Sequence, residues 1–351
     1  MSIRDLFLLD PDVAFLNHGS YGACPRPVFE AYQRWQRELE RQPVEFLWRR
    51  LEGLVAAARA ELASYVGASA DDLVFVPNAT SGLNAVIRSL RLGPDDEVLT
   101  TAHEYGAIDR TWEFVGARVV RVEPEELVGA IGRRTRVVSM SHVTSPTALV
   151  LPVEEVCRAA REAGVLSVVD GAHAPGHVPV ALEALGADVY AGNCHKWLCA
   201  PKGAGFLWAR PEHQRWIEPL VVSWGWGAET SFAERHGWQG TRDPAAYLAV
   251  PDAIAFVREH GRPEERRALL DGLAERLPYR PVPGRRAPFM GAWELPQCDA
   301  EEVQRRLYDE HRVEVPVREW EGRQLVRVSV GPYTDASDLE RLERALETVL
   351  D

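Results

Sequence analysis

The chain has 351 residues, of which 46% are hydrophobic, and it carries a formal net charge of −12 at pH 7. This length is more than one hydrophobic core usually spans, so we expect two domains or one large α/β unit. The acidic balance and the lack of any Lys/Arg cluster argue against nucleic acid or an anionic membrane surface as a partner.

No stretch of the chain approaches the roughly 18 apolar residues of a membrane span. The apolar start at residues 3–9 is too short and too soon interrupted for a signal peptide. The five cysteines form no CxxC pair, which predicts neither a disulfide framework nor a zinc site. We therefore expect a reduced, cytoplasmic protein that holds no metal.

Two amphipathic helices are predicted at the start of the chain. Pro25 and Pro27 open the first, which runs toward Arg41, because proline suits the first turn of a helix. Apolar residues at helical spacing predict the second helix over residues 47–65.

Short apolar, β-branched runs then alternate with helix-length segments such as 81–92 and 153–163. The runs cover residues 73–76, 97–101, 119–122, 137–140, 167–169, 189–191 and 204–208. Strands that are apolar on both faces and separated by helices indicate a largely parallel sheet covered on both sides.

The segment 221–243 breaks this alternation. It is rich in Trp and Gly and is predicted to be a long ordered loop, since its three tryptophans argue against disorder. Two helices follow at 245–259 and 263–277, and then a strand, helix, strand, strand, helix pattern. We expect an N-terminal segment, 1–20, that packs near the active site, a large domain, 21–255, and a small α+β domain, 256–351.

Only two of the 40 basic residues are lysines, Lys196 and Lys202. A guanidinium keeps its proton in a protein, whereas an ammonium can lose it when it is desolvated. A lysine retained in such a chain is a candidate for Schiff-base chemistry. The alternative is a coding bias that left two lysines by chance, and composition alone does not decide between them.

Ligands of open parallel sheets bind beyond the carboxyl ends of the strands. A small-residue turn, 78–84, follows the first strand of the predicted sheet, and its Thr80 and Ser81 could help a helix N-terminus to bind an anion. An ordinary helix cap is the alternative. Asp170 and Lys196 follow two later strands, where both side chains could face the same ligand. Alternatively, Asp170 is an ordinary turn residue and Lys196 is a solvated surface lysine.

Together these loops supply an anion-binding turn, a carboxylate and an amine. Pyridoxal phosphate needs this set: the lysine forms a Schiff base, the aspartate keeps the pyridine nitrogen protonated, and a helix N-terminus holds the phosphate. Each signal is weak alone, but their order and their strand-end placement predict this cofactor.

The chain resembles the class V aminotransferase family of fold type I pyridoxal-phosphate enzymes over nearly its whole length. Residues 78–84 are similar to the phosphate turn of the family, 170–173 to its pyridinium-aspartate motif and 193–196 to its lysine motif. The resemblance implies a fold type I α/β architecture, with a mostly parallel seven-stranded sheet covered by helices and a smaller α+β C-terminal domain.

The resemblance also implies roles for individual residues. Tyr105 would stack on the cofactor, His173 would lie near its phenolic oxygen, and Arg327 would hold the substrate α-carboxylate. Thr241, in 240–242, would reach the phosphate of a neighbouring subunit, which implies a homodimer with shared active sites. The implied catalytic residues are Lys196, Asp170, His173 and Tyr105; the cofactor-binding residues are Ala79, Thr80, Ser81, Tyr105, Ser145, Asp170, His173, Asn193, His195, Lys196 and Thr241; the substrate-binding residues are Arg327, Asn17 and His18.

Within the family, residues 15–25 and 141–149 look most like the isopenicillin-N-epimerase-like branch, which also holds C–S lyases. Cysteine desulfurases carry a persulfide-forming cysteine shortly before the carboxylate arginine, but residues 314–323 contain none. Desulfuration through an enzyme persulfide is therefore disfavoured. The chain is also short for the epimerases, which disfavours a bulky peptide-like substrate.

The resemblance implies that a small amino acid forms an external aldimine and that Lys196 removes its Cα proton. We expect a β-lyase of the C–S lyase or desulfurase-like kind. The alternatives are an isopenicillin-N-epimerase-like amino-acid epimerase, whose second acid would be Tyr105, His173 or His18, and an aminotransferase. A non-catalytic homologue, or an unrelated protein with chance motifs, is disfavoured because Lys196, Asp170 and Arg327 are all present.

Overall fold

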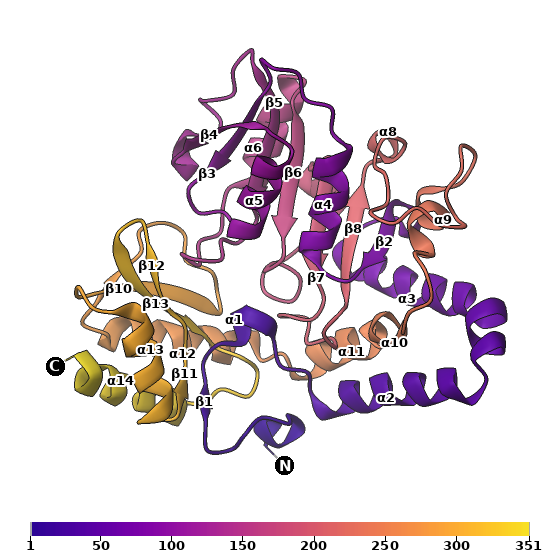
Figure 1. The fold of residues 1–351 in the computed structure, drawn as a ribbon. Coiled ribbons are helices and arrows are strands. Elements are labelled where there is room, and N and C mark those ends of the chain that lie inside the picture. The colour runs from indigo at the N-terminus through magenta and orange to yellow at the C-terminus, as the bar shows by residue number, and fades with distance from the viewer. Residues whose placement is uncertain (1, 351) are drawn as a thin grey trace.

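The computed structural model of the chain describes residues 2–350. Figure 1 shows a large α/β part beside a smaller part built from the C-terminal third of the chain. The large part contains a seven-stranded sheet with strand order β2-β8-β7-β6-β5-β3-β4. All neighbouring strands run parallel except β8, which is antiparallel to both β2 and β7. The predicted fold class, with its seven strands, is confirmed.

The strands of this sheet are short and almost completely buried. Their bounds are β2 Leu73–Val76, β3 Glu97–Thr101, β4 Arg118–Val122, β5 Thr135–Ser141, β6 Leu166–Gly171, β7 Val189–Asn193 and β8 Gly205–Ala209. Only β4, at one edge, has no fully buried residue, as a half-covered edge strand should.

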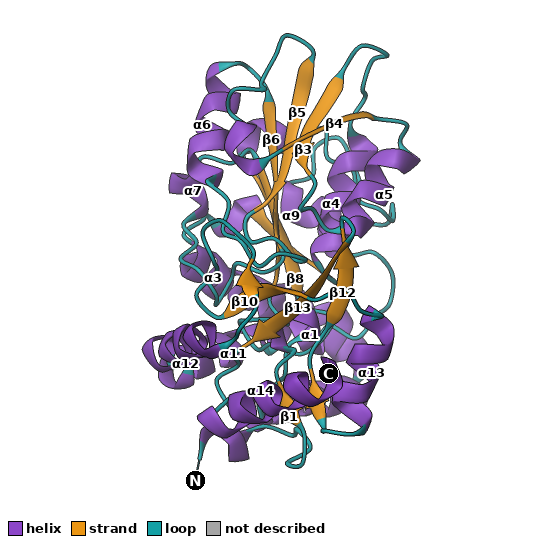
Figure 2. Cartoon of the chain, turned by 90° about the vertical axis from the view of Figure 1, so that its left-hand side faces the viewer, coloured by secondary structure: helices purple, strands orange, loops and turns teal. Residues whose placement is uncertain are grey.

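Helices cover both faces of the sheet, and each face has its own hydrophobic core. Figure 2 shows α6 (Val153–Glu162) and α7 (Leu182–Leu185) on one side, and α4 (Ala79–Ser89) and α5 (Gly106–Phe114) on the other. Leu83, Ile108 and Trp112 belong to the α4 and α5 core, while Val156 belongs to the opposite core, which also takes in α2 (Arg26–Arg41), α3 (Leu51–Val66), α10 (Ala245–Leu248) and α11 (Val250–His260).

The smaller part is built on a four-stranded antiparallel sheet of order β12-β13-β10-β9. Its elements are α12 Pro263–Arg276, β9 Arg280–Pro281, β10 Met290–Leu295, α13 Ala300–Asp309, β12 Val317–Trp320, β13 Arg323–Ser329 and α14 Ala336–Leu350. The N-terminal segment joins it, because β1 (Ala14–Phe15) pairs in parallel with β11 (Val313–Glu314). This pairing carries the following helix α1 (His18–Tyr21) toward the junction of the two parts.

The remaining helices are short. They are α8 Pro211–Gln214, α9 Phe232–Gly237, 3-10 turns at Ile3–Leu6, Ala70–Asp72 and Pro124–Glu126, and a π-helix at Glu45–Arg50. The segment 221–243 differs from the predicted loop, since a capping box between Ser231 and Glu234 starts α9 within it. Trp224 is 93% exposed, so it does not order the segment by packing. No helix among residues 2–350 has the length and apolar character needed to cross a membrane.

Candidate active site

Eight of the fourteen predicted site residues line one cavity of about 300 Å³ at the carboxyl ends of the parallel strands. Its wall contains Asn78 and Thr80 after β2, Tyr105 after β3, Ser141 and Ser145 at and after β5, Asp170 and His173 at and after β6, and Asn193, His195 and Lys196 at and after β7. Ser20 and Tyr21 of α1, together with Lys202, complete it. The strand-end rule thus accounts for most of the cavity wall.

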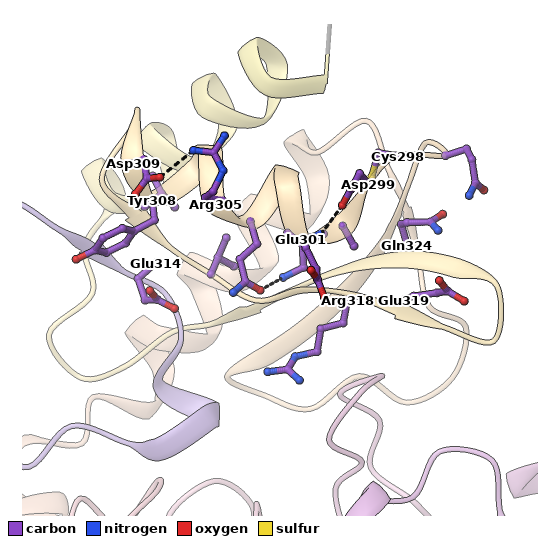
Figure 3. A pocket seen from close by; sticks show the side chains of 16 residues that line it. Cys298, Asp299, Glu301, Arg305, Tyr308, Asp309, Glu314, Arg318, Glu319 and Gln324 are labelled. Carbon is purple, nitrogen blue, oxygen red and sulfur yellow. Dashed lines mark hydrogen bonds and ion pairs between the residues drawn. The ribbon is translucent and has the colours of Figure 1, made fainter.

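A larger groove of about 1300 Å³ lies in the smaller part, along α13, β11 and β12. Figure 3 shows two of its charged side chains, Arg305 and Asp299, bonded to another side chain and to the local backbone. Arg305 pairs with Asp309 at 3.0 Å, and Asp299 accepts from the first N–H groups of α13. The groove contains none of the predicted catalytic residues, so we place the candidate site in the smaller cavity.

Lys196 and His173 both line this cavity, and Lys196 Nζ lies 3.0 Å from His173 Nε2. Burial, and then the positive charge of Arg327, lower the pKa of Lys196 to about 7, although Asp170 opposes the shift. A large share of the side chain is therefore an uncharged amine near neutral pH, which is the form that acts as a nucleophile or a base.

Asp170 ends β6 and is only 7% exposed. Its Oδ1 accepts a hydrogen bond of 2.9 Å from the N–H of Ala172. Burial raises the pKa of Asp170, while Ala172 and Lys196 act in the opposite direction. No Lys, Arg or His of residues 2–350 forms an ion pair with this carboxylate, so it is available to a cationic group of a ligand.

The predicted phosphate turn caps α4 with side chains. Asn78 Oδ1 accepts from the N–H of Ser81 at 2.8 Å, and Asn193 Oδ1 accepts from the N–H of Ala79 at 2.8 Å. The N–H groups of Ala79 and Ser81 are thus engaged, and neither residue lines the cavity. This arrangement differs from the expectation that both contact phosphate directly, since among residues 79–81 only Thr80 faces the cavity.

His195 faces the same end of the cavity. Its Nδ1–H donates to the carbonyl of Ala204 at 3.0 Å, which leaves Nε2 for a ligand. Burial lowers the pKa of His195 to about 4, and Lys196 and Lys202 add to this effect. Thr80, His195 and the positive end of the α4 dipole together fit an anion.

Arg327 is a buried cation without a carboxylate partner among residues 2–350, and it does not itself line the cavity. Its Nη1 donates to Ser145 O at 2.6 Å and Oγ at 3.1 Å, and its Nη2 donates to Ser20 Oγ at 3.0 Å. Its Nε is buried with no hydrogen-bond partner, and burial lowers the pKa of Arg327 to about 10. A buried charge normally needs a counter-ion, so the guanidinium fits a ligand carboxylate.

Two predicted substrate contacts lie outside the cavity. Asn17 bridges Ser20 and Glu314 through its side-chain amide, with Ser20 Oγ donating at 2.5 Å and Asn17 Nδ2 donating at 2.9 Å. His18 is fully buried and donates from Nε2 to the carbonyl of Lys196 at 3.1 Å. Both residues bond to parts of the chain that surround the cavity, and a substrate contact for either stays a prediction.

One further predicted residue lies apart from the cavity, and three residues at the site, Ser141, Glu104 and Ser20, were not predicted. Thr241 is exposed and does not line the cavity of its own chain. Ser141, the last residue of β5, lines it and donates to the buried carboxylate of Glu104 at 2.6 Å. Burial raises the pKa of Glu104 to about 7. The strand-end rule could have found Ser141, whereas Ser20 lay within the segment 15–25, whose resemblance to the epimerase-like branch gave this residue no role.

The cavity can therefore hold a molecule with an aldehyde for Lys196, a protonated ring nitrogen for Asp170 and a phosphate for the α4 terminus. Tyr105, which is 46% exposed at the cavity wall, supplies an aromatic face beside them. These residues fit pyridoxal phosphate, and Arg327 fits the carboxylate of an amino acid.

Comparisons with known proteins bear on this assignment. A family model described as Aminotransferase class-V matches residues 24–277. The isopenicillin N epimerases of Streptomyces clavuligerus and Amycolatopsis lactamdurans are 36% and 38% identical, over 99% and 98% of this chain and 97% of each relative. A probable chloroplastic L-cysteine desulfhydrase of Arabidopsis thaliana is 32% identical over 71% of this chain and 59% of its own length.

Solved structures share the fold. The cysteine desulfurase CsdA of Escherichia coli superposes with a TM-score of 0.83 at 22% identity, covering 99% of this chain and 97% of CsdA. A lysine-to-alanine mutant of C-DES with glycine covalently linked to its PLP cofactor gives a TM-score of 0.85 at 21% identity over the full length of both chains. These likenesses support the architecture alone.

Proposed function

The chain belongs to the aminotransferase class-V family, and from this premise we propose that it is a pyridoxal-phosphate-dependent amino-acid epimerase. We choose epimerisation because the chain is similar to two isopenicillin N epimerases along nearly its whole length. The relatives named as desulfhydrases reach 28–34% identity over about 70% of this chain. The epimerase alternative is thus better supported than the β-lyase that the sequence led us to expect.

Bound pyridoxal phosphate supplies an aldehyde that condenses with amines and a ring that takes up electrons from Cα. Asp170 keeps a proton on the ring nitrogen, and Thr80, His195 and the α4 terminus hold the phosphate. Arg327 binds the substrate carboxylate with its guanidinium fork, which suits a bidentate anion. With these contacts made, Lys196 would be the base available to the bound amino acid.

Lys196 acts as the base that removes the Cα proton on one face, because its amine is uncharged near neutral pH. Inversion then needs an acid on the opposite face. His173 lies 3.0 Å from Lys196 Nζ and so shares the lysine's side. Tyr105 follows β3, which is separated from β7 by β6 and β5, and approaches from another direction. We assign the second acid to Tyr105.

A small amino acid is the preferred substrate. The cavity of about 300 Å³ lies at the lower end of the range for small-molecule sites, and it must also hold the cofactor. The alignment with the Streptomyces epimerase spans 386 positions, more than the 351 residues of this chain. That relative therefore carries segments that this chain lacks, which argues against a substrate as large as isopenicillin N.

A homodimer is part of the proposal. Trp224 and Trp226 of the segment 221–243 are 93% and 52% exposed, beside the exposed Val221 and Val222. Exposed apolar side chains that gather in one segment mark interaction surfaces. A second copy of the chain would cover them and bring its Thr241 toward the phosphate.

A β-lyase is the second candidate, because several relatives are named L-cysteine desulfhydrase. A route through an enzyme persulfide is not favoured, since no cysteine lines the cavity. Cys194 and Cys199 are buried, and burial raises the pKa of both thiols, which keeps them protonated.

The deciding experiment incubates the pyridoxal-phosphate-loaded protein in deuterium oxide with a panel of L-amino acids and S-substituted cysteines. An epimerase places deuterium at Cα and inverts the configuration without net loss of amino acid, as chiral chromatography and mass spectrometry would record. Formation of pyruvate and ammonia would instead establish the lyase. Formation of a keto acid in an amount equal to that of the bound cofactor would establish the aminotransferase. A protein that fails to bind pyridoxal phosphate would overturn the whole proposal.

A further inference from the structure

Trp197 directly follows the candidate catalytic lysine and is completely buried. Its indole Nε1–H donates a hydrogen bond of 3.2 Å to Nδ1 of His173. The other nitrogen of the same imidazole, Nε2, lies 3.0 Å from Lys196 Nζ. One histidine ring thus joins the tryptophan to the lysine.

The direction of these hydrogen bonds follows from the donors available. An indole N–H can only donate, so Nδ1 of His173 must be the acceptor and carry no proton. The ring is neutral, because burial, and then Lys196, hold the pKa of His173 well below its usual value. A neutral imidazole has one N–H, which must therefore be Nε2–H, a tautomer assigned from its partners.

This tautomer fixes the protonation state of the lysine. The Nε2–H group points at Lys196 Nζ and needs a lone pair there to accept it. A neutral amine has that lone pair, whereas an ammonium has three N–H groups and none. If Lys196 were protonated, its N–H groups would face the Nε2–H of His173. Moving the His173 proton to Nδ1 would relieve this clash, but Nδ1–H would then face the N–H of the indole.

We propose that Trp197 is a positioning residue that keeps Lys196 in its uncharged, reactive form by fixing the tautomer of His173. The charged groups that face the amine are Arg327 on β13, which also disfavours the ammonium, and Asp170 on β6, which favours it. Trp197, acting through His173, opposes the stabilisation of the ammonium by the Asp170 carboxylate.

The surroundings of Trp197 hold its indole in place. His177 stacks on it with ring centroids 4.0 Å apart, and Arg266 lies 5.4 Å above its ring. His177 is itself fixed, since its Nε2 accepts from the N–H of Phe289 at 3.1 Å and its Nδ1–H donates to His173 O at 3.0 Å. The indole N–H therefore has one direction, toward His173.

The inference rests on the proposed function for its chemical use, but the state of the amine belongs to the cofactor-free chain and is measured there. With Lys202→Arg, the full-length protein contains one lysine, so ¹³C-lysine labelling gives the Lys196 titration directly by NMR. Trp197→Phe keeps an aromatic ring but loses the N–H. We expect the pKa of Lys196 to rise by at least about one unit, a tenfold change in the amine-to-ammonium ratio.

The matched control is Trp208→Phe, because Trp208 is also buried but its Nε1 has no hydrogen-bond partner. This change should leave the Lys196 titration where it was. In a His173→Leu background, Trp197→Phe should lose its effect, since leucine has neither a donor nor an acceptor to link the indole to the amine. An equal shift in both backgrounds would mean that Trp197 acts by packing and would overturn the proposal.

A second readout needs no variant at Trp197. The ¹⁵N shifts of His173, assigned by comparison with His173→Gln, should show a protonated Nε2 and a bare Nδ1 in the cofactor-free protein. A proton on Nδ1 would overturn the inference even if Trp197→Phe does not fold. Failure to bind pyridoxal phosphate, by contrast, would remove the proposed function and leave both NMR results unchanged.

Discussion

Ser20 Oγ accepts a hydrogen bond of 3.0 Å from Arg327 Nη2, although 307 positions separate the two residues in the chain. The contact links α1, next to the β1–β11 pair, to strand β13 of the smaller sheet. Asn17 fixes the serine from behind. The two ends of the chain thus hold one guanidinium against Ser20 and Ser145, which line the cavity.

Arg327→Lys should weaken substrate binding more than it weakens turnover. A lysine keeps the charge but loses the planar fork that binds a carboxylate through two hydrogen bonds. Losing one charged hydrogen bond costs about 1.5–3 kcal/mol, so kcat/KM should fall by about 10- to 100-fold. Steady-state kinetics would measure the change, and Arg318→Lys, outside the cavity, is the matched control. Equal kcat/KM for Arg327→Lys and the parent would remove Arg327 from the carboxylate site.

Lys196→Ala should abolish covalent attachment of the cofactor. Borohydride reduction of the loaded protein, followed by peptide mass spectrometry, should place a pyridoxyl group on the peptide that contains Lys196, because a neutral amine condenses with an aldehyde. Lys202→Arg should keep this mark. A pyridoxyl group found on Lys202 in the parent protein would assign the chemistry to the wrong lysine.

The reactivity of Lys196 should depend on pH around 7. Because its pKa is lowered to about 7 by burial, the amine is protonated below that pH and free above it. Acylation of Lys196 in cofactor-free Lys202→Arg protein should therefore reach half its maximal rate near pH 7, and a midpoint near 10 would contradict the burial effect. An unfolded lysine keeps its proton up to about pH 10.4, so this group should make stability rise with pH between these two values.

The sequence could predict some residues of this site but not others. Asp170 and Lys196 could be placed together because parallel strands end at one edge of a sheet, and that rule depends only on chain order. Ser20 could not, since its approach to Arg327 depends on the β1–β11 pairing. For Ala79 and Ser81 a phosphate contact stays a prediction, and the local sequence does not reveal that Asn193 and Asn78 accept from their N–H groups.

Asn193→Ala should destabilise the fold. Asn193 is buried and its Oδ1 is the acceptor for the N–H of Ala79. Its loss leaves a buried donor unsatisfied, which costs about 1–3 kcal/mol. Urea unfolding of the cofactor-free protein would measure the loss, and Asn193→Asp, which keeps an acceptor oxygen at the helix N-terminus, should lose less. Equal stability of Asn193→Ala and the parent would mean that water replaces the amide.

Tyr105→Phe should separate the two proton transfers of an epimerase. Lys196 would still remove and return the Cα proton on its own face, so one enantiomer should continue to exchange Cα hydrogen for deuterium. Inversion should fall by about 10²–10⁴-fold, the usual contribution of a general acid, because the hydroxyl on the other face is gone while the ring remains. Exchange and chiral analysis of the same samples give both rates. If inversion and exchange fall together, Tyr105 serves the cofactor rather than the second proton transfer, and another acid must reach Cα from the side away from Lys196.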